Sequence, residues 1–461
     1  MKRSIWLMLV LFACAAAWAG CASKTGTLPD EGGKNADDTP VTREQVREEF
    51  RHAWNGYKQY AWGHDELKPL SKGYKDWYQE PLLMTPVDAL DTMIIMGLTA
   101  EAREDKELIV SSLSFDQDME VLHFELCIRL LGGLLSAYEL DGDQRLLDLA
   151  VDLADRMIPV FDSPTGMPYR MVNLKTGKAS GAVSGPAQVG TYILEYGTLS
   201  RLTGNPVYYD RAKRALTALY ERRSQIGLVG SAIDVNRGWW LVGDSSVGGG
   251  IDSYYEYLLK GSLLFNDPDL MAMWEGSISA INAHLADDSA AGLWYGHAGM
   301  NSGRRTAATF GALDAFFPAA LALGGDLGRA ARLEDSCYRM WTLAGIEPEM
   351  MDYRKMKVVF GPYPLRPEII ESAYYLYHYT GDDKYRRMGY VFFNSTVKYC
   401  RTEAGYAALA DVRAKAKSDA MPSYFLAETL KYYYLLFAEP GEFNFDNVIF
   451  NTEAHPLFKN R

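Results

Sequence analysis

Five short breaks between helical segments recur at nearly constant intervals, and this spacing constrains the fold more than any other feature of the chain. Each break joins a helix stop to a new N-terminal cap. The breaks fall at residues 140–143, 202–205, 265–269, 323–326 and 379–382. With Gly142, Gly204, Asp267, Gly324 and Gly381 as markers, the intervals are 62, 63, 57 and 57 residues. The chain therefore repeats a helical hairpin about every sixty residues, which indicates an array of repeats.

The two helices of each predicted hairpin differ in composition. The first is apolar and aromatic on most faces, whereas the second, for instance residues 144–161 or 326–343, is amphipathic. An open solenoid would also satisfy the repeat. The contrast between the two helices instead favours the inner and outer helices of a closed, all-α toroid. Strand patterns are sparse along the chain.

Three acidic residues occupy the same place in different predicted hairpins. Glu125 lies 17 residues before its marker, Asp252 lies 15 before, and Glu368 lies 13 before. All three begin an inner helix, and the starts of the inner helices share one rim of the toroid. Taken singly, an acid at such a place is equally explained by the helix dipole. Three in one register predict carboxylates that converge on an axial cavity and divide into acid and base roles.

The first residues have the pattern of an export signal. Lys2 and Arg3 precede an apolar run over residues 5–19, which is too short to span a bilayer comfortably. Two cleavage sites are open. Residues 17–19 fit a signal peptidase site, whereas residues 19–21 resemble the end of a lipobox, which would leave Cys21 as a lipidated N-terminus.

The chain is therefore divided into three parts. Residues 1–21 are the predicted signal peptide, and residues 22–41 are polar and rich in Gly and Pro, as in a flexible tether. Residues 42–461 form one predicted domain, which opens with a capping box between Thr42 and Gln45. Export would place the protein in the periplasm, on the outer membrane of a bacterium through a lipid at Cys21, or outside the cell.

Composition argues against several classes of function. The net charge of −12 becomes −14 when Lys2 and Arg3 leave with the signal, and such a charge repels nucleic acid. The seven histidines lack zinc-binding spacing, and no nucleotide-binding or nucleophile-elbow motif occurs. Cys127, Cys337 and Cys400 remain beyond the signal, so at most one disulfide can form among them.

Six blocks of sequence carry a resemblance to a known family. They are, in order, residues 87–92, 124–138, 252–260, 365–372, 425–432 and 451–456. Through them the chain resembles the class I α-mannosidases, glycoside hydrolase family 47, over residues 41–456. The resemblance implies an (α/α)7 barrel whose floor is plugged by the segment around Thr452. It also implies a monomeric, calcium-dependent exo-α-1,2-mannosidase that removes terminal mannose from mannose-containing oligosaccharides with inversion.

The resemblance assigns the metal site. It implies that Thr452 binds Ca²⁺ through its hydroxyl and its backbone carbonyl, while waters fill the remaining positions. Glu368, Glu428 and Glu453 would orient those waters. The chemistry is reasonable because Ca²⁺ accepts several oxygen ligands in an irregular shell, including sugar hydroxyls.

The resemblance also assigns catalytic and sugar-binding roles. Inversion needs an acid and a base separated by roughly 6.5 to 9.5 Å. Glu368 is expected to be the base and Glu125 the acid, with Asp252 a close rival for the acid. We expect Phe425 to stack beneath the bound sugar. Arg129 and Arg366 are expected to hold carboxylates or sugar hydroxyls, and structural ion pairing is their alternative role.

The segment 313–318 departs from the pattern of the processing mannosidases. It replaces their His-Leu-x-Cys-Phe sequence and looks closer to the ER-degradation-enhancing branch of the family. The family's Cys falls on Ala315 and its His near Ala312. The disulfide of the processing enzymes is therefore expected to be absent, and linkage specificity is less well defined than reaction class.

Two rival functions remain. A glycan-binding protein could keep the toroid without the chemistry, but the joint presence of Glu125, Asp252, Glu368 and Thr452 argues against it. An (α/α)6 hydrolase or lyase acting on acidic polysaccharide is the other. The negative charge of the chain suits a neutral sugar better.

Overall fold

The computed structural model describes residues 37–289, 292–439 and 441–459. The predicted signal peptide and most of the predicted tether, residues 22–36, lie outside the described residues. Helix α1 (Arg43–Tyr60) begins after Thr42, whose hydroxyl accepts a hydrogen bond from the Gln45 amide at 3.3 Å. Gln45 Oε1 accepts one from the Thr42 amide at 2.8 Å. The predicted capping box is confirmed.

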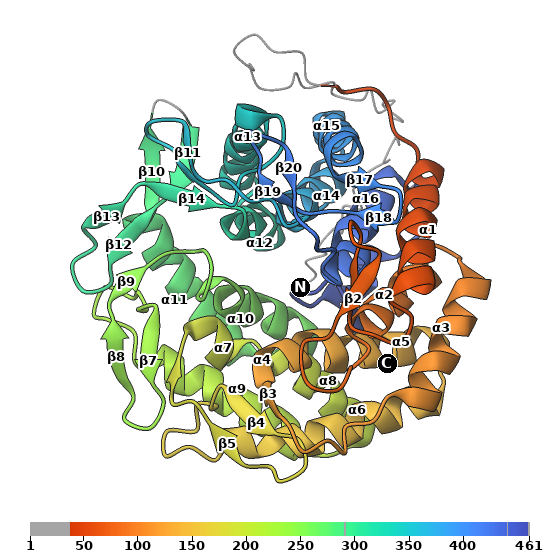
Figure 1. The fold of residues 1–461 in the computed structure, drawn as a ribbon. Helices are drawn as coiled ribbons and strands as arrows, with labels where there is room; N and C mark the ends of the chain where they lie inside the picture. The colour runs from red at the N-terminus through yellow and green to blue at the C-terminus, as the bar shows by residue number, and fades with distance from the viewer. Residues whose placement is uncertain (1–36, 290–291, 440, 460–461) are drawn as a thin grey trace, which may run out of the picture.

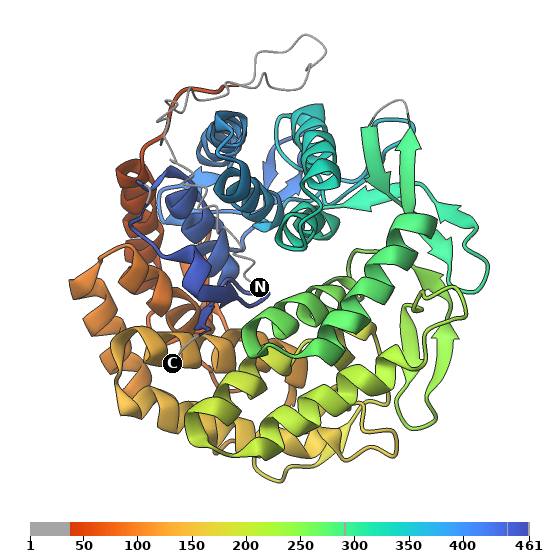
Figure 2. The same ribbon diagram turned by 180° about the vertical axis from the view of Figure 1, so that it is seen from behind.

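The described helices close into a ring of seven inner and seven outer members (Figure 1, Figure 2). The inner members are α2 (Met84–Ile95), the continuous run α4 (His123–Glu125), η1 (Leu126–Leu131) and α5 (Gly132–Asp141), α8 (Ile193–Thr203), α10 (Asp252–Phe265), α12 (Phe317–Leu323), α14 (Glu368–Thr380) and α16 (Leu430–Phe437). The outer members are α3 (Thr99–Ser112), α6 (Gln144–Met157), α9 (Pro206–Tyr220), α11 (Pro268–His284), α13 (Leu327–Ala344), α15 (Asp383–Cys400) and α1. Each inner helix packs on the outer helix of its own hairpin, so the fold is the (α/α)7 barrel that the sequence predicts.

The predicted helix breaks lie at the turns from inner to outer helices. Gly142, Gly204 and Gly381 cap their inner helices in the left-handed conformation, and Asn266 does the same for α10. Two of the seven helix pairs were not predicted from the sequence. Helices α2 and α3 turn at Gly97, and the seventh pair joins α16 to α1, which lie side by side although they come from opposite ends of the chain (Figure 1).

The connections from outer to inner helices are longer and carry nearly all the strands. Three-stranded sheets have the orders β3-β4-β5, β6-β7-β8, β13-β12-β9 and β14-β15-β16, and pairs form between β1 and β2, β10 and β11, β17 and β18, and β19 and β20. All these ladders are antiparallel. The strands therefore gather on the rim where the inner helices begin.

The bounds of these strands follow the chain around the rim. They are β1 (Glu66–Lys68), β2 (Gly73–Lys75), β3 (Glu120–Leu122), β4 (Met171–Asn173), β5 (Ala179–Ser180), β6 (Val183–Ser184), β7 (Ala232–Asp234), β8 (Trp239–Val242), β9 (Asp244–Ser245), β10 (Ala286–Ser289), β11 (Gly292–Tyr295), β12 (His297–Gly299), β13 (Arg305–Ala307), β14 (Thr309–Gly311), β15 (Met350–Asp352), β16 (Lys357–Phe360), β17 (Arg401–Thr402), β18 (Gly405–Tyr406), β19 (Leu409–Asp411) and β20 (Ala416–Lys417). Short helices α7 (Pro186–Gly190), η2 (Ile158–Phe161), η3 (Leu313–Phe316) and η4 (Phe425–Thr429) complete the rim connections.

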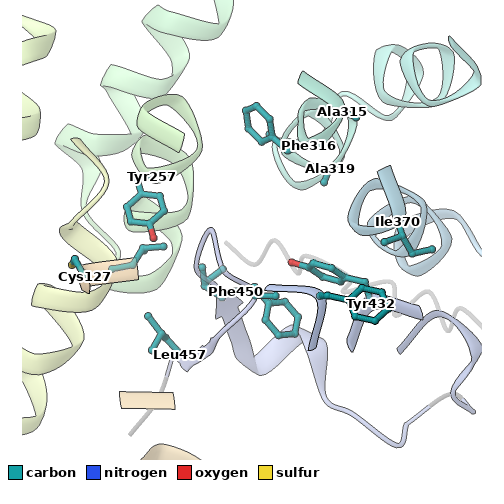
Figure 3. Packing of buried hydrophobic residues seen from close by; sticks show 14 of the residues in the cluster. Cys127, Tyr257, Ala315, Phe316, Ala319, Ile370, Tyr432, Phe450 and Leu457 are labelled. Atoms are coloured by element: carbon teal, nitrogen blue, oxygen red, sulfur yellow. The ribbon is translucent and has the colours of Figure 1, made fainter. Parts of the chain in front are cut away.

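A final hairpin enters the ring along its axis. It consists of β21 (Val448–Phe450) and β22 (Pro456–Phe458), preceded by η5 (Phe445–Asn447). Figure 3 shows Leu457 on the side of Cys127 and Tyr257, while Phe450 lies beside Tyr432, with ring centroids 5.8 Å apart. The hairpin thus fills the barrel between opposing inner helices, as expected of a floor around Thr452.

Two glycines make room for this hairpin. A Cβ atom on Gly132 would lie 2.5 Å from Asn451 Nδ2, and one on Gly133 would lie 2.9 Å from the Val87 carbonyl oxygen. Helix α5 can therefore approach both the hairpin and α2 only because these two positions carry no side chain.

Cys127, Cys337 and Cys400 are buried free thiols, in agreement with the expected loss of the family disulfide. None of the described helices combines the length and apolar character that a membrane crossing requires.

A network of buried charges fastens the hairpin to the inner helices. Lys431 Nζ lies 2.8 Å from Asp91 Oδ1 and donates to the Ala454 carbonyl at 2.6 Å. His455 Nδ1 lies 2.7 Å from Asp91 Oδ2, and its Nε2 lies 3.3 Å from Asp88 Oδ1. Burial alone would raise the pKa of Asp91, but Lys431 and His455 lower it to about 2. The carboxylate is therefore held ionised inside the barrel.

Removal of one partner should leave this carboxylate buried without its main counter-charge. We expect Lys431→Met to lower the free energy of unfolding by about 3–5 kcal/mol, measured by chemical denaturation. The matched control is Lys355→Met, which removes an exposed lysine paired to Asp352 and should leave the midpoint nearly unchanged. Equal midpoints for the two variants would show that the buried network does not fasten the hairpin.

Candidate active site

An axial cavity of about 400 Å³ opens where the inner helices begin. Eight of the nine predicted site residues line it. They are Glu125, Arg129, Asp252, Arg366, Glu368, Glu428, Thr452 and Glu453. The volume falls in the range of roughly 300–1,000 Å³ that small-ligand sites occupy. The register argument therefore located the cavity from sequence, whereas the chemical role of each residue stays a prediction.

The ends of three inner helices position the predicted catalytic acids. Asp252 and Glu368 are the first residues of α10 and α14, and Glu125 is the last residue of α4. Helix starts favour acidic side chains because the peptide dipoles are aligned. Immediately after Glu125 the chain widens into the π-helical turn η1, and Glu428 lies in a second π-helical turn, η4. Such turns are frequent at functional sites.

Arg129 gathers the acids on one side of the cavity. Its Nε donates to Glu125 Oε2 at 3.1 Å, and its Nη1 donates to Glu453 Oε2 at 2.6 Å. Asp88 Oδ2 lies 3.7 Å from the same Nη1. Helix η1 and the axial hairpin are thereby joined by one guanidinium, which is itself buried. Both roles predicted for Arg129, ion pairing and holding of site carboxylates, meet in this geometry.

Arg366 is a second arginine in the cavity lining. It binds Glu349 with two hydrogen bonds of 2.6 and 3.1 Å and lies 3.9 Å from Glu368 Oε1. The preceding residue, Leu365, has a φ of 66°, a left-handed conformation that costs energy for a side-chain-bearing residue. This turn aims Arg366 and Glu368 into the cavity together.

The prediction for Phe425 is wrong. Phe425 is fully buried outside the cavity lining, with its ring 4.7 Å from that of Tyr406. The preceding Tyr424 lines the cavity instead, because successive helical residues point in directions about 100° apart. The Tyr424 ring lies between Arg129, at 5.6 Å, and Arg366, at 5.8 Å.

Burial sets the electrostatics of the acids. Burial raises the pKa of Asp252 to about 6, although the Ser253 amide and hydroxyl donate to its Oδ1 at 2.6 and 3.0 Å. Burial also raises the pKa of Glu368 to about 7, partly opposed by Arg366, and its Oε2 has no hydrogen-bond partner. Burial, followed by repulsion from Glu453 and Glu368, raises the pKa of Glu428 well above its usual range.

The hairpin turn that carries Thr452 is fixed by hydrogen bonds. Asn451 Nδ2 donates to Glu195 Oε1 and to the Ile128 carbonyl, both at 2.9 Å. The Tyr257 hydroxyl donates to Glu195 Oε1 at 2.6 Å and accepts from the Thr452 amide at 3.3 Å. Ala454 closes the turn with a φ of 57°. Thr452 is thus presented at the cavity floor by a rigid support.

Sequence analysis missed several cavity groups. Glu256, Glu371 and Tyr424 line the cavity, and Lys260 pairs with Glu256 and lies 3.6 Å from Glu371. A signal was present, because Glu256 follows Asp252 by four residues and Lys260 follows Glu256 by four, which places all three on one helix face. Glu349 had no local signal, since its partner Arg366 comes from another segment.

No group of three or more His, Cys, Asp or Glu side chains suited to hold a metal ion occurs in the described part of the chain.

Comparisons with known proteins agree with this geometry. The sequence profile of Glycosyl hydrolase family 47 matches residues 49–459. The structure of an alpha-1,2-mannosidase from Trichoderma reesei superposes with a TM-score of 0.83 at 28% identity, covering 90% of this chain and 98% of that chain.

Two curated relatives are similar along most of their length. The ER degradation-enhancing alpha-mannosidase-like protein 2 of Mus musculus is 39% identical, over 95% of this chain and 80% of the relative. The mannosyl-oligosaccharide 1,2-alpha-mannosidase MNS1 of Arabidopsis thaliana is 36% identical, over 94% of this chain and 82% of the relative.

The family match, together with the mannosidases among the relatives and the solved structures, indicates that the chain is a glycoside hydrolase. The chain belongs to glycosyl hydrolase family 47, as the blocks around its carboxylates indicated.

The raised pKa of Glu368 has a consequence for stability. A carboxyl whose pKa is higher in the folded than in the unfolded state stabilises the fold while protonated, and this contribution is lost as the pH rises through the folded value of about 7. Glu368→Gln keeps the shape without the charge. We expect the variant to exceed the stability of the parent by only about 1 kcal/mol at pH 5 and by roughly 3 kcal/mol at pH 8.5.

Thermal denaturation at both pH values, with chelator present, measures this difference. Glu403→Gln, at an exposed position, is the control and should show no comparable gain at high pH. A Glu368→Gln difference that is the same at pH 5 and pH 8.5 would contradict the buried, proton-retaining carboxyl.

Proposed function

We propose that the protein is a calcium-dependent, inverting exo-α-1,2-mannosidase that hydrolyses terminal mannose from mannose-containing oligosaccharides. One observation carries the proposal. Glu125, Asp252 and Glu368, which are far apart in sequence, line a single cavity whose floor presents Thr452. Glycoside hydrolysis requires a pair of carboxyl groups. The α-1,2 linkage is taken from two relatives, the mannosidase MNS1 of Arabidopsis thaliana and the mannosidase of Trichoderma reesei, which are both named as 1,2-α-mannosidases.

The proposed reaction is a single displacement. Glu368 removes a proton from a water molecule, and the water oxygen bonds to the anomeric carbon of the terminal mannose. The bond from that carbon to the leaving oxygen breaks at the opposite face, and the leaving oxygen takes a proton from the general acid, directly or through water. The Tyr424 ring lines the cavity beside Arg129 and Arg366, where these three side chains would contact the sugar.

The surroundings of the two candidate acids differ. The Glu125 carboxylate accepts a hydrogen bond from the Arg129 guanidinium at 3.1 Å. Asp252 lines the cavity at the start of α10, and burial raises its pKa to about 6, so it holds a proton closer to neutral pH. These surroundings support Asp252 as the proton donor, with Glu125 as the alternative that acts through a water.

The residues at the floor fit a calcium ion. The Glu368, Glu428 and Glu453 carboxyls crowd one region with Arg129 as the cation beside them, and their mutual repulsion is the condition that a bound cation relieves. Thr452 would hold the ion through its hydroxyl and carbonyl oxygens, and the carboxylates would hold its waters. When bound, the ion supplies positive charge that lowers the pKa of nearby carboxyls and accepts sugar hydroxyls as ligands.

Substrates with different leaving groups should distinguish a variant that lacks the general acid from one that lacks the general base. Loss of a general acid lowers the rate on α-1,2-mannobiose by about 10²–10⁴-fold, yet spares a mannoside whose leaving group departs without a proton. We expect Asp252→Asn to show this selective loss in kcat/KM and Glu368→Gln to lose activity on both substrates. If Glu125→Gln instead shows the selective loss, the donor is Glu125. Retained turnover by Glu368→Gln would remove it as the base.

Thr452→Ala should weaken calcium binding. We expect calcium to raise the melting temperature of the parent and to raise that of Thr452→Ala much less, since the hydroxyl ligand is gone. Thr306→Ala, an exposed position of β13, is the control and should keep the parental calcium response. An unchanged calcium affinity in Thr452→Ala would remove Thr452 from the metal site.

The decisive test is proton NMR of α-1,2-mannobiose with the enzyme, with calcium and then with EDTA. Initial release of β-mannose that stops on chelation supports the substrate class, inversion and metal dependence together. Sugar binding without release would favour the alternative, a mannose-glycan-binding protein on the same fold.

We further propose export through residues 1–21, to the periplasm, the outer membrane or the exterior, and action as a monomer. The intact mass of the mature protein distinguishes cleavage after Ala19 from lipidation of Cys21.

A further inference from the structure

A second cavity, of about 520 Å³, lies at the other end of the inner helices. It is bordered by the last turns of α14 and by the segment around η5. Helix α14 begins at Glu368 in the axial cavity and ends at Thr380 beside this one. Thirteen helical residues at 1.5 Å each separate the two cavities by about 20 Å. The hairpin that carries Thr452 fills the barrel between them, so the second cavity is not an extension of the first.

Several aromatic side chains line one part of its wall. Tyr374, Tyr377, His378 and Phe445 all line the cavity. The Phe445 centroid lies 5.2 Å from that of Tyr374 and 4.6 Å from that of His378, both edge to face. The Arg386 guanidinium lies 5.5 Å from the Tyr377 centroid. The rings are therefore held in place by their neighbours and form a preorganised apolar wall.

The polar side chains at the edge are two carboxylates and one amide. Glu439, Asp446 and Asn444 supply them, and no lysine or arginine lines the cavity within the described chain. Lys459 donates to the Asp446 backbone carbonyl at 2.9 Å. Such a wall has no donor cation for a phosphate or a uronic acid. His378 Nε2 lies 3.0 Å from Asp446 Oδ1, so one oxygen of this carboxylate already has a partner.

Flat apolar rings beside a carboxylate and an amide match a pyranose, which has an apolar face and a girdle of hydroxyls. We propose that this cavity is a non-catalytic binding site for a neutral oligosaccharide. Its place at the far end of the barrel would let the protein hold one glycan branch or chain while the axial cavity accepts another. That the sugar is mannose rests on the proposed function, whereas binding at this site does not depend on hydrolysis.

The test counts binding sites in a chain that cannot turn over its ligand. Isothermal titration of Glu368→Gln with α-linked mannotriose should give two sites. Adding Asp446→Ala, a change at an exposed side chain, should weaken one of them about tenfold or more and leave the other unchanged. Adding Tyr377→Ala should remove the same site. Tyr379→Ala is the matched control, because Tyr379 is a neighbouring aromatic residue that is 37% exposed and does not line the cavity.

Hydrolysis provides the second readout. Asp446→Ala in the otherwise unchanged enzyme should keep the parental kcat/KM on α-1,2-mannobiose, since the axial cavity is untouched. A single binding site whose affinity is the same with and without Asp446→Ala would overturn the proposal of a second site. Displacement of mannotriose from the second site by glucosamine, a cationic sugar, would overturn the proposal that its ligand is neutral. Failure of the mannosidase function alone would appear differently, as an absent hydrolytic activity with Asp446-dependent binding intact.

Discussion

The polar turn of the axial hairpin is the constraint on which the rest of the structure depends. A turn placed inside a barrel leaves its amide and carbonyl groups without water, and each unpaired group would cost free energy. The Asn451 side chain forms hydrogen bonds with several of these buried groups. Its Nδ2 donates to Glu195 and Ile128, and its Oδ1 accepts from the amides of Glu453 and His455. One side chain thereby orders the turn and ties it to two inner helices.

The same turn couples stability to chemistry. Below it, Asp91, Lys431 and His455 compensate one another's charges, and the ion pairs stabilise the ionised forms. Above it, Glu368, Glu428 and Glu453 outnumber the arginines that face them, and burial raises their pKa values. The lower network is held ionised by its opposite charges, while the upper carboxyls are held in their protonated forms up to higher pH than usual. The carboxyl groups with raised pKa values therefore lie together in the axial cavity, where the proposed cation and sugar would bind.

The sequence predicted those parts of the fold and site that depend on short, local patterns of residues. Glycine marks the helix ends at positions 142, 204 and 381, so the repeat could be predicted from their spacing. The same spacing predicted that the three carboxylates lie on one rim of the barrel. The turn at Gly97 was missed because α3 begins after Leu98 without a side-chain cap, whereas Asp143, Asn205 and Asp382 cap the helices that follow the other glycine turns. Phe425 was preferred to Tyr424 because helical direction near a π-helical turn cannot be judged from residue type. Pairs such as Arg129 with Glu453 join segments more than three hundred residues apart, and no local pattern announces them.

The seventh hairpin has a consequence for how the chain acquires its activity. Helix α1 leaves the ribosome first but packs on α16, which follows more than three hundred and sixty residues later. Contacts this distant in sequence form slowly, because a long loop must close before they contribute. The turn that carries Thr452 comes later still. The last segments of the chain therefore complete two things at once: α16 closes the ring of helices against α1, and the turn at Thr452 completes the cavity that the three carboxylates line.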